Sequence, residues 1–306
     1  MIKSELDGHL ALLKVAFPYL LISLCYAGLF LLVEENFGDH IYMISGQVGS
    51  VFGLALAFFL GFRMNSAYDR WWEGRKIIGE LINNTRSFTN KVYTYIGRGE
   101  HLKPAFEGNG LPLADEMLDL TQAFVLQFST ELSGGTKAQQ SASPAFVELD
   151  EIVPTNKLTN EILLALSVKV DAVMQQGSDL EKSDLMAHIT RFYDIQGKAE
   201  RIKYTPFLMI YSAFTRIIVF GYVLLTPLLI GDIDILGENS GMEYLSVPIM
   251  ALIGTAFLTI NRLANLYGAP FSGNVTALPV DDIATKLIDN VREVREKCVV
   301  KTAAVD

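Results

Sequence analysis

The sequence predicts an all-α membrane protein with four transmembrane helices, and three observations support this fold class. The chain has 306 residues, of which 50% are hydrophobic, and its mean hydropathy is +0.30. Its formal net charge is nevertheless −9, so apolar and charged residues must be segregated along the chain. No stretch alternates with the two-residue period of a strand over a convincing length. These features are typical of a helical membrane protein with a large water-exposed part.

Four apolar stretches are long enough to cross a bilayer, because a hydrocarbon core about 30 Å thick requires roughly 20 apolar residues of helix. Buried helices of soluble domains are usually shorter and polar on one face, whereas Leu20–Val33 and Ile217–Ile230 are apolar almost all round. The first stretch is too long for the apolar region of a signal peptide, so we expect it to remain as a span. The predicted spans are residues 12–33, 42–62, 207–230 and 245–263.

Basic residues predict the orientation of these spans. The connections after the first and third spans, residues 34–40 and 231–238, contain no lysine or arginine. Several basic residues follow the second span, and others lie near the C-terminus. Because lysine and arginine are retained on the cytoplasmic side, the segments that carry them are predicted to be cytoplasmic. We expect a multi-pass protein of the plasma or inner membrane. Both termini, residues 63–206 and residues 264–306 are then cytoplasmic.

The segment between the second and third spans is predicted to form a helical cytosolic bundle. Apolar residues recur at helical spacing in residues 73–97, 113–132, 160–175 and 184–202. These helices have too little apolar surface to span a membrane and too much to stand alone in water. We therefore expect them to pack together and to continue the second and third spans. Residues 133–144 are polar and aperiodic, which predicts a loop.

Residue patterns for catalysis or cofactor binding are missing from the sequence. It has no Walker-type phosphate loop, nucleophile elbow, EF-hand, cysteine cluster or His/Glu metal-binding spacing. Cys25 and Cys298 are too far apart in the predicted topology to pair. We therefore expect neither an enzyme nor a cofactor or metal site, and no nucleic-acid partner.

The most distinctive motif follows the second span. That span ends in Gly61-Phe62-Arg63, and residues 65–76 read Asn-Ser-Ala-Tyr-Asp-Arg-Trp-Trp-Glu-Gly-Arg-Lys. This run resembles the signature of the bestrophin family, particularly its bacterial branch. Further matches follow in the expected order over nearly the whole chain, at Ala199–Ile202, Thr205-Pro206, Pro270-Phe271 and Leu278–Ile283.

The resemblance implies a homopentameric ion channel in which the second span of each subunit lines a narrow apolar neck. The residues that match the neck are Leu54, Phe58 and Phe62, and their i, i+4, i+8 spacing places them on one helix face. Such a hydrophobic constriction can gate by dewetting. Because every face of this helix is apolar, the spacing alone is equally compatible with ordinary packing. For a second constriction at the cytosolic exit, the candidate is Leu180.

The residues just beyond the neck are interpreted as structural. Tryptophans at this position suit anchoring at the membrane surface, and Asp69 or Glu73 is available to pair with Arg63 or Arg70. The residues concerned are Arg63, Tyr68, Asp69, Arg70, Trp71 and Trp72.

Arg216 lies inside the third span, where a charge must be paired or wetted. It has either a carboxylate partner, such as Asp69 or a residue of a neighbouring subunit, or a role in an anion pathway. The family usually carries acids at the end of the fourth span, where this chain has Asn261, Arg262 and Asn265.

Calcium-gated animal bestrophins bind the activating ion with a run of acids after the Pro-Phe pair. The corresponding run here, Ser272-Gly273-Asn274-Val275-Thr276-Ala277, has no carboxylate. We therefore expect no calcium activation by that route.

The sequence leaves the conducted ion open. Phenylalanine edges carry a positive quadrupole and tolerate chloride, which favours anions. The acidic outer connections, the net charge and the cation-conducting members of the bacterial branch support sodium as the alternative. A non-conducting carrier or scaffold is a further alternative, although four spans without internal repeats argue against it. The expected partners are further copies of the chain, membrane lipid, and chloride or sodium ions.

Overall fold

The computed structural model describes residues 5–37, 44–97, 111–134, 157–174, 178–230 and 246–303, and every regular element in these ranges is a helix. This confirms the all-α prediction for the described residues. The chain divides into two compact units. The first, here called the apolar unit, comprises Met1–Trp72, Pro206–Pro270 and Asn274–Ala277. The second, the polar unit, comprises Glu73–Thr205, Phe271–Gly273 and Leu278–Asp306.

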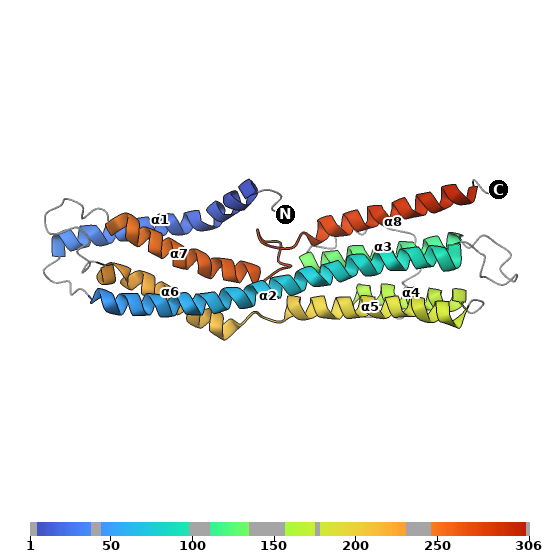
Figure 1. Cartoon of the computed structure of the whole chain (residues 1–306), viewed down its shortest axis with the longest axis horizontal. Coiled ribbons are helices and arrows are strands. Elements are labelled where there is room, and N and C mark those ends of the chain that lie inside the picture. Colours follow the sequence, from blue (N-terminus) through green and yellow to red (C-terminus); the bar gives the residue numbers. More distant parts are fainter. Residues whose placement is uncertain are drawn as a thin grey trace. The chain divides into compact units, whose positions relative to one another are not determined.

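The apolar unit contains α1 (Glu5–Phe37), the first part of α2 (Gly46–Val92), α6 (Met209–Ile230) and α7 (Ser246–Tyr267). Within this unit, α7 lies beside both α1 and α6 (Figure 1). The described residues include four helices that are long and apolar enough to cross a membrane, which confirms the predicted number. The predicted spans largely coincide with these helices. Residues 44, 45, 207 and 208 precede α2 and α6 and are not helical, and residues 42, 43 and 245 lie outside the described ranges.

Small residues let the helices of the apolar unit approach one another. A side chain on Gly53 of α2 would place its Cβ 2.5 Å from the Tyr222 hydroxyl of α6. A side chain on Gly254 of α7 would lie 2.8 Å from Ser23 of α1. Helices in lipid gain little from the hydrophobic effect, so close contact of this kind is their main source of packing energy. The buried cluster between them consists of Leu56, Leu60, Val219 and Leu258.

The polar unit contains the rest of α2, a π-helical turn at Tyr93–Gly97, α3 (Leu111–Ser133), α4 (Leu158–Met174), α5 (Asp179–Tyr204) and α8 (Val280–Ala303). Within it, α3 lies beside α4 and α8, and α4 lies beside α5. The four helical stretches expected between the spans are all present. The helix α8 was not predicted from the sequence. It carries Asp281 and Asp282 in its first turn, where carboxylates interact favourably with the helix dipole.

Aromatic rings form the centre of the polar unit. The ring of Phe192 on α5 lies 5.9 Å from that of Phe88 on α2 and 5.1 Å from that of Phe124 on α3. All three side chains are fully buried. This unit therefore has the interior of a water-soluble helical bundle, with its apolar side chains turned inward.

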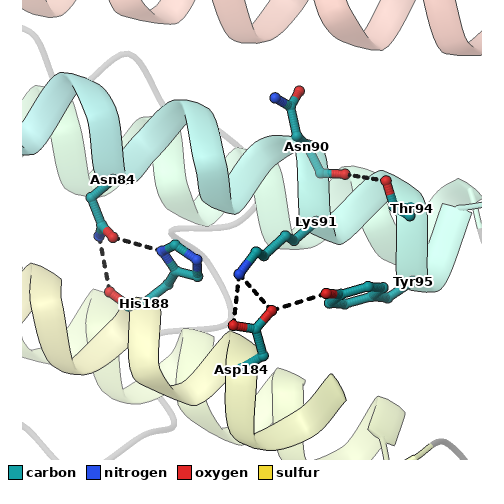
Figure 2. Close-up of polar contacts among 7 residues, drawn as sticks. All are labelled: Asn84, Asn90, Lys91, Thr94, Tyr95, Asp184 and His188. Carbon is teal, nitrogen blue, oxygen red and sulfur yellow. Dashed lines mark hydrogen bonds and ion pairs between the residues drawn. The ribbon is translucent and has the colours of Figure 1, made fainter. Parts of the chain in front are cut away.

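Charged side chains of the polar unit are paired with carboxylates near its surface. Lys91 on α2 forms an ion pair of 2.5 Å with Asp184 on α5, and Tyr95 donates to the same carboxylate at 2.9 Å (Figure 2). Next to this pair, the ring of buried His188 lies 2.7 Å from the Asn84 amide oxygen, while the Asn84 amide donates to the His188 carbonyl (Figure 2). These contacts join α2 to α5.

The first outer connection was predicted to begin at residue 34, but residues 34–37 form the end of α1. The rest of the outer connections and most of the predicted 133–144 loop lie outside the described ranges. These residues are 38–43, 231–245 and 135–144.

Candidate ion pathway

The three predicted neck residues share the most exposed face of α2. Leu54, Phe58 and Phe62 are 65%, 63% and 62% exposed in the single chain, and the rings of Phe58 and Phe62 lie 6.0 Å apart. The residues of α2 that are buried against the other helices of the apolar unit are Leu56, Leu60, Arg63 and Ala67.

Helix geometry places these two sets on opposite sides of α2. With roughly 100° of rotation per residue, Phe58 lies about 200° round the helix from Leu56. The stripe of Leu54, Phe58 and Phe62 is therefore turned away from the buried face of its own helix. Periodicity could not distinguish the faces of this helix, whereas burial does. The stripe is left for lipid, for another copy of the chain or for an ion path.

Beyond the stripe, the same face of α2 becomes polar. Asn65 and Asp69 are exposed and fall within the angular range of the three apolar residues. A face that contacts lipid along its whole length would remain apolar. The change from apolar side chains to an amide and a carboxylate is expected of an ion path leading into water, and equally of a helix face that leaves the membrane.

Arg63 is completely buried on the opposite face, and its partners are neutral. Its guanidinium donates to the hydroxyl of Thr215 on α6 at 2.9 Å, and to the amide oxygens of Asn261 and Asn265 on α7. Asp69 or Glu73 was considered as a partner of either Arg63 or Arg70. For Arg63 the observed partners are instead a hydroxyl and two amides, and Glu73 pairs with Arg201 at 2.9 Å.

The aromatic residues after Arg63 pack the middle of α2 against other parts of the apolar unit. The Trp71 indole donates to the carbonyl of Thr276 at 2.9 Å and packs edge-on against Tyr267 at the end of α7. Tyr68 stacks on Trp71 and Trp72. The guanidinium of Arg70 lies 5.8 Å from the centre of the Phe207 ring, within the range of a cation–π contact. These contacts are of the kind expected of structural residues, while the Asp69 side chain faces outward.

Two further arginines of the apolar unit point outward. Arg216 on α6 and Arg262 on α7 are exposed, and neither forms a hydrogen bond or ion pair with any residue that the structure describes. The carboxylate partner considered for Arg216 is thus not observed within the described part of the chain.

Leu180, the candidate for the cytosolic constriction, lies in the first turn of α5 and is 81% exposed. Its backbone amide donates to the Ser178 hydroxyl, which caps the helix. The assignment of Leu180 to a constriction stays a prediction.

The turn at the position of the animal calcium site is closed by Asn274. The Asn274 amide donates to the carbonyls of Leu266 and Ala269 at 3.1 and 3.3 Å, and its oxygen accepts from the amide and hydroxyl of Thr276. No group of three histidine, cysteine, aspartate or glutamate residues that could hold a metal occurs among the residues described.

A family model described as "Bacterial/Fungal Bestrophin protein" matches residues 8–293. The chain belongs to this bestrophin family. This confirms the resemblance seen in residues 61–76. Bestrophins are a channel family and not a family of enzymes, which confirms the expectation that the chain is not an enzyme.

Known bestrophin relatives cover most of the chain. The voltage-dependent anion channel-forming protein alr2987 of Nostoc is 24% identical over 256 residues, 80% of this chain and 76% of the relative. The voltage-dependent anion channel-forming protein YneE of Escherichia coli is 26% identical over 242 residues, 78% of this chain and 73% of the relative. The crystal structure of a bacterial bestrophin homologue from Klebsiella pneumoniae superposes with a TM-score of 0.72 at 19% identity, over 92% of this chain and 98% of that one. These matches support a membrane location and a bestrophin fold.

In this bestrophin, the sequence analysis noted Asn261 and Asn265 only as departures from the acids usual in the family. Their role as partners of Arg63 was missed, and so was that of Thr215. The i, i+4 spacing of the two asparagines was a signal, because it places both amides on one face of α7. The position of Arg63 opposite that face was not available from the sequence.

Proposed function

We propose that this bestrophin assembles as a homopentamer and conducts small monovalent ions, with chloride and other anions favoured over sodium. In this proposal, Leu54, Phe58 and Phe62 of each α2 line a neck of three stacked apolar rings. The polar unit forms a cytosolic helical bundle that extends the path towards Leu180. Both termini are cytoplasmic, and the spans lie in the plasma or inner membrane.

The observation that carries this proposal is the exposed apolar stripe opposite the buried face of α2. Around a closed symmetry axis, such a stripe supplies one element of each ring without any change in the chain's own packing. The edges of the Phe58 and Phe62 rings carry the partial positive charge of the ring quadrupole and would attract a passing anion. The printed names of the Nostoc and Escherichia coli relatives, anion channel-forming proteins, support the same choice.

We also propose that calcium does not activate the channel through residues 272–277. All the hydrogen-bonding atoms of the Asn274 side chain are used within its own turn, and the run contributes no carboxylate. A current that rises with calcium in the wild type, and loses this response in Asn274→Ala, would contradict this proposal.

The proposed function is tested by reconstituting the purified protein in planar bilayers with unequal NaCl on the two sides. We expect a current whose reversal potential is displaced towards the equilibrium potential of chloride. Displacement towards that of sodium would instead identify a cation channel of the same fold. The absence of any current from a particle with the mass of one or two chains by native mass spectrometry would favour the carrier or scaffold.

A further inference from the structure

Three arginines of the apolar unit lie at one level of the helices. Arg63 on α2 donates to Thr215 on α6 and to Asn261 on α7. The residues that follow these two partners are Arg216 and Arg262. Successive residues of a helix are displaced by about 1.5 Å along its axis, so Arg216 and Arg262 lie close to the level of Arg63. We call these three residues the arginine layer.

No carboxylate lies at the level of the arginine layer on the three helices that form it. The α6 and α7 sequences contain no acidic residue, and α2 has none between Gly46 and Asp69. Asp69 follows Arg63 by six residues, which corresponds to about 9 Å along the helix, and it lies on the face of Leu54, Phe58 and Phe62. This one carboxylate opposes the three arginines of the layer. The observed partners of Arg63 are a hydroxyl and two amide oxygens. A neutral partner satisfies a guanidinium's hydrogen bonds and leaves its charge in place.

The arginine layer coincides with the inner end of the proposed neck. Phe62, the last of the three apolar residues, immediately precedes Arg63. The Arg63 side chain is buried on the side of α2 away from Phe62, so it does not contact an ion in the neck. It acts on such an ion through its electric field, which is screened less in apolar surroundings than in water. A symmetric assembly would repeat this field in every subunit.

We infer that the arginine layer makes the path selective for anions by raising the electrostatic potential at the inner end of the neck. The neck itself carries no formal charge, so it excludes ions by their hydration and not by their sign. Fixed positive charges around such a constriction raise the local concentration of chloride and lower that of sodium. This inference rests on the proposed function, and it assigns a selectivity role to residues outside the neck.

The test is the ratio of chloride to sodium permeability, measured from reversal potentials in bilayers of zwitterionic phosphatidylcholine. The variant Arg216→Gln/Arg262→Gln removes two exposed charges without removing an observed contact, so we expect it to fold. Its chloride-to-sodium permeability ratio should fall by about tenfold, because charges lining a cleft change the local ion concentration by a factor of about ten or more. Arg63→Gln should also lower the ratio, and Arg63→Lys should restore it, because lysine keeps the charge.

A control is Arg292→Gln, which removes one positive charge, as Arg63→Gln does, from an exposed position on α8 in the polar unit. Its permeability ratio should equal that of the wild type. If Arg63→Gln fails to assemble, the Arg216→Gln/Arg262→Gln variant decides the question alone.

Two results would overturn the inference while leaving the proposed function standing. One is an anion-selective wild type whose ratio is unchanged in the arginine variants. The other is a change that occurs only in bilayers with anionic lipid, because the arginines would then act by binding headgroups. A wild type that conducts sodium in preference to chloride would overturn both proposals, and the wild-type recording alone identifies that case.

Discussion

Phe192 of the polar unit is completely buried between two other rings, whereas Phe58 of the apolar unit is 63% exposed. Charged residues show the reverse. Lys91 and Asp184 pair near the surface of the polar unit, and Arg63 of the apolar unit has no exposed surface at all. The polar unit is thus organised for contact with water. The apolar unit exposes phenylalanines and buries the Arg63 guanidinium against polar partners, as expected in lipid. Its exposed cations include Arg216 and Arg262.

The largest expected difference between the units is in stability. Phe192→Ala should lower the free energy of unfolding by about 3–5 kcal/mol, because it removes a fully buried ring and leaves a cavity. Phe58→Ala is the matched control: the same chemical change is made where the side chain is not buried by its own chain. Unfolding in denaturant, followed by circular dichroism, compares the two. Equal losses would show that Phe58 is buried in the assembly as firmly as a core residue.

The second expected difference is in conductance. Phe58→Ala/Phe62→Ala should widen the neck and raise the single-channel conductance several-fold, because two of the three apolar rings are removed. Phe220→Ala is the control, since Phe220 is exposed on α6 of the same unit but lies off the stripe. A double variant with the conductance of the wild type would indicate that another element sets the constriction.

A smaller effect concerns the pH dependence of the polar unit. Burial lowers the pKa of His188, and the charges of Lys91 and Arg191 lower it further, while Asp184 opposes them. The folded protein therefore holds this imidazole neutral at a pH where the unfolded chain, with a pKa of about 6.5, takes up a proton. The stability contributed by neutral His188 is present above about pH 6.5 and is lost as the pH falls through the folded pKa.

The measurement for this prediction is the thermal midpoint as a function of pH. Between about pH 7.5 and 5, the wild type should lose more stability than His188→Gln, which has no proton to gain. Asp184 does not complicate this range. The bond from Lys91 lowers the pKa of Asp184, so its contribution is lost only in more acidic solution. Equal slopes in the two proteins would contradict the assignment.

The smallest expected effect is that of a surface ion pair in the polar unit. Lys198 and Glu80 are 2.7 Å apart, and both side chains are almost half exposed. A double-mutant cycle of Lys198→Ala and Glu80→Ala should give a coupling energy of less than about 1 kcal/mol, because water screens the pair. A coupling above about 2 kcal/mol would mean that the pair is buried in the assembled protein.

The sequence was sufficient for features that depend on long, local patterns. Hydropathy predicted four spans because each apolar run is far longer than a soluble core helix requires. Residues 65–76 identified the family because a run of consecutive matches needs no knowledge of contacts. By contrast, α8 was not predicted, although the signal is present in the sequence. Its buried residues recur at helical spacing, and they are Val280, Ala284, Leu287, Ile288 and Val291.

Features that depend on distant contacts could not be predicted. Arg63 is 152 residues from Thr215 and 202 from Asn265 along the chain, and no local pattern connects them. The sequence also could not predict that Leu54, Phe58 and Phe62 lie opposite the buried face, because all faces of that helix are apolar. Burial of Leu56 and Leu60 against α6 and α7 distinguishes the faces, and burial is a property of the packed helices.

The most direct test of the proposed neck is the accessibility of Phe58 to a charged, water-soluble thiol reagent. The background is Cys25→Ala/Cys298→Ala, because Cys25 is a free, exposed thiol. In this background we expect a sulfonate reagent to block the current of Phe58→Cys. It should leave Leu252→Cys unaffected, since Leu252 is exposed on α7 and away from the stripe. Block of Leu252→Cys with no effect on Phe58→Cys would contradict the assignment of the ion path to α2.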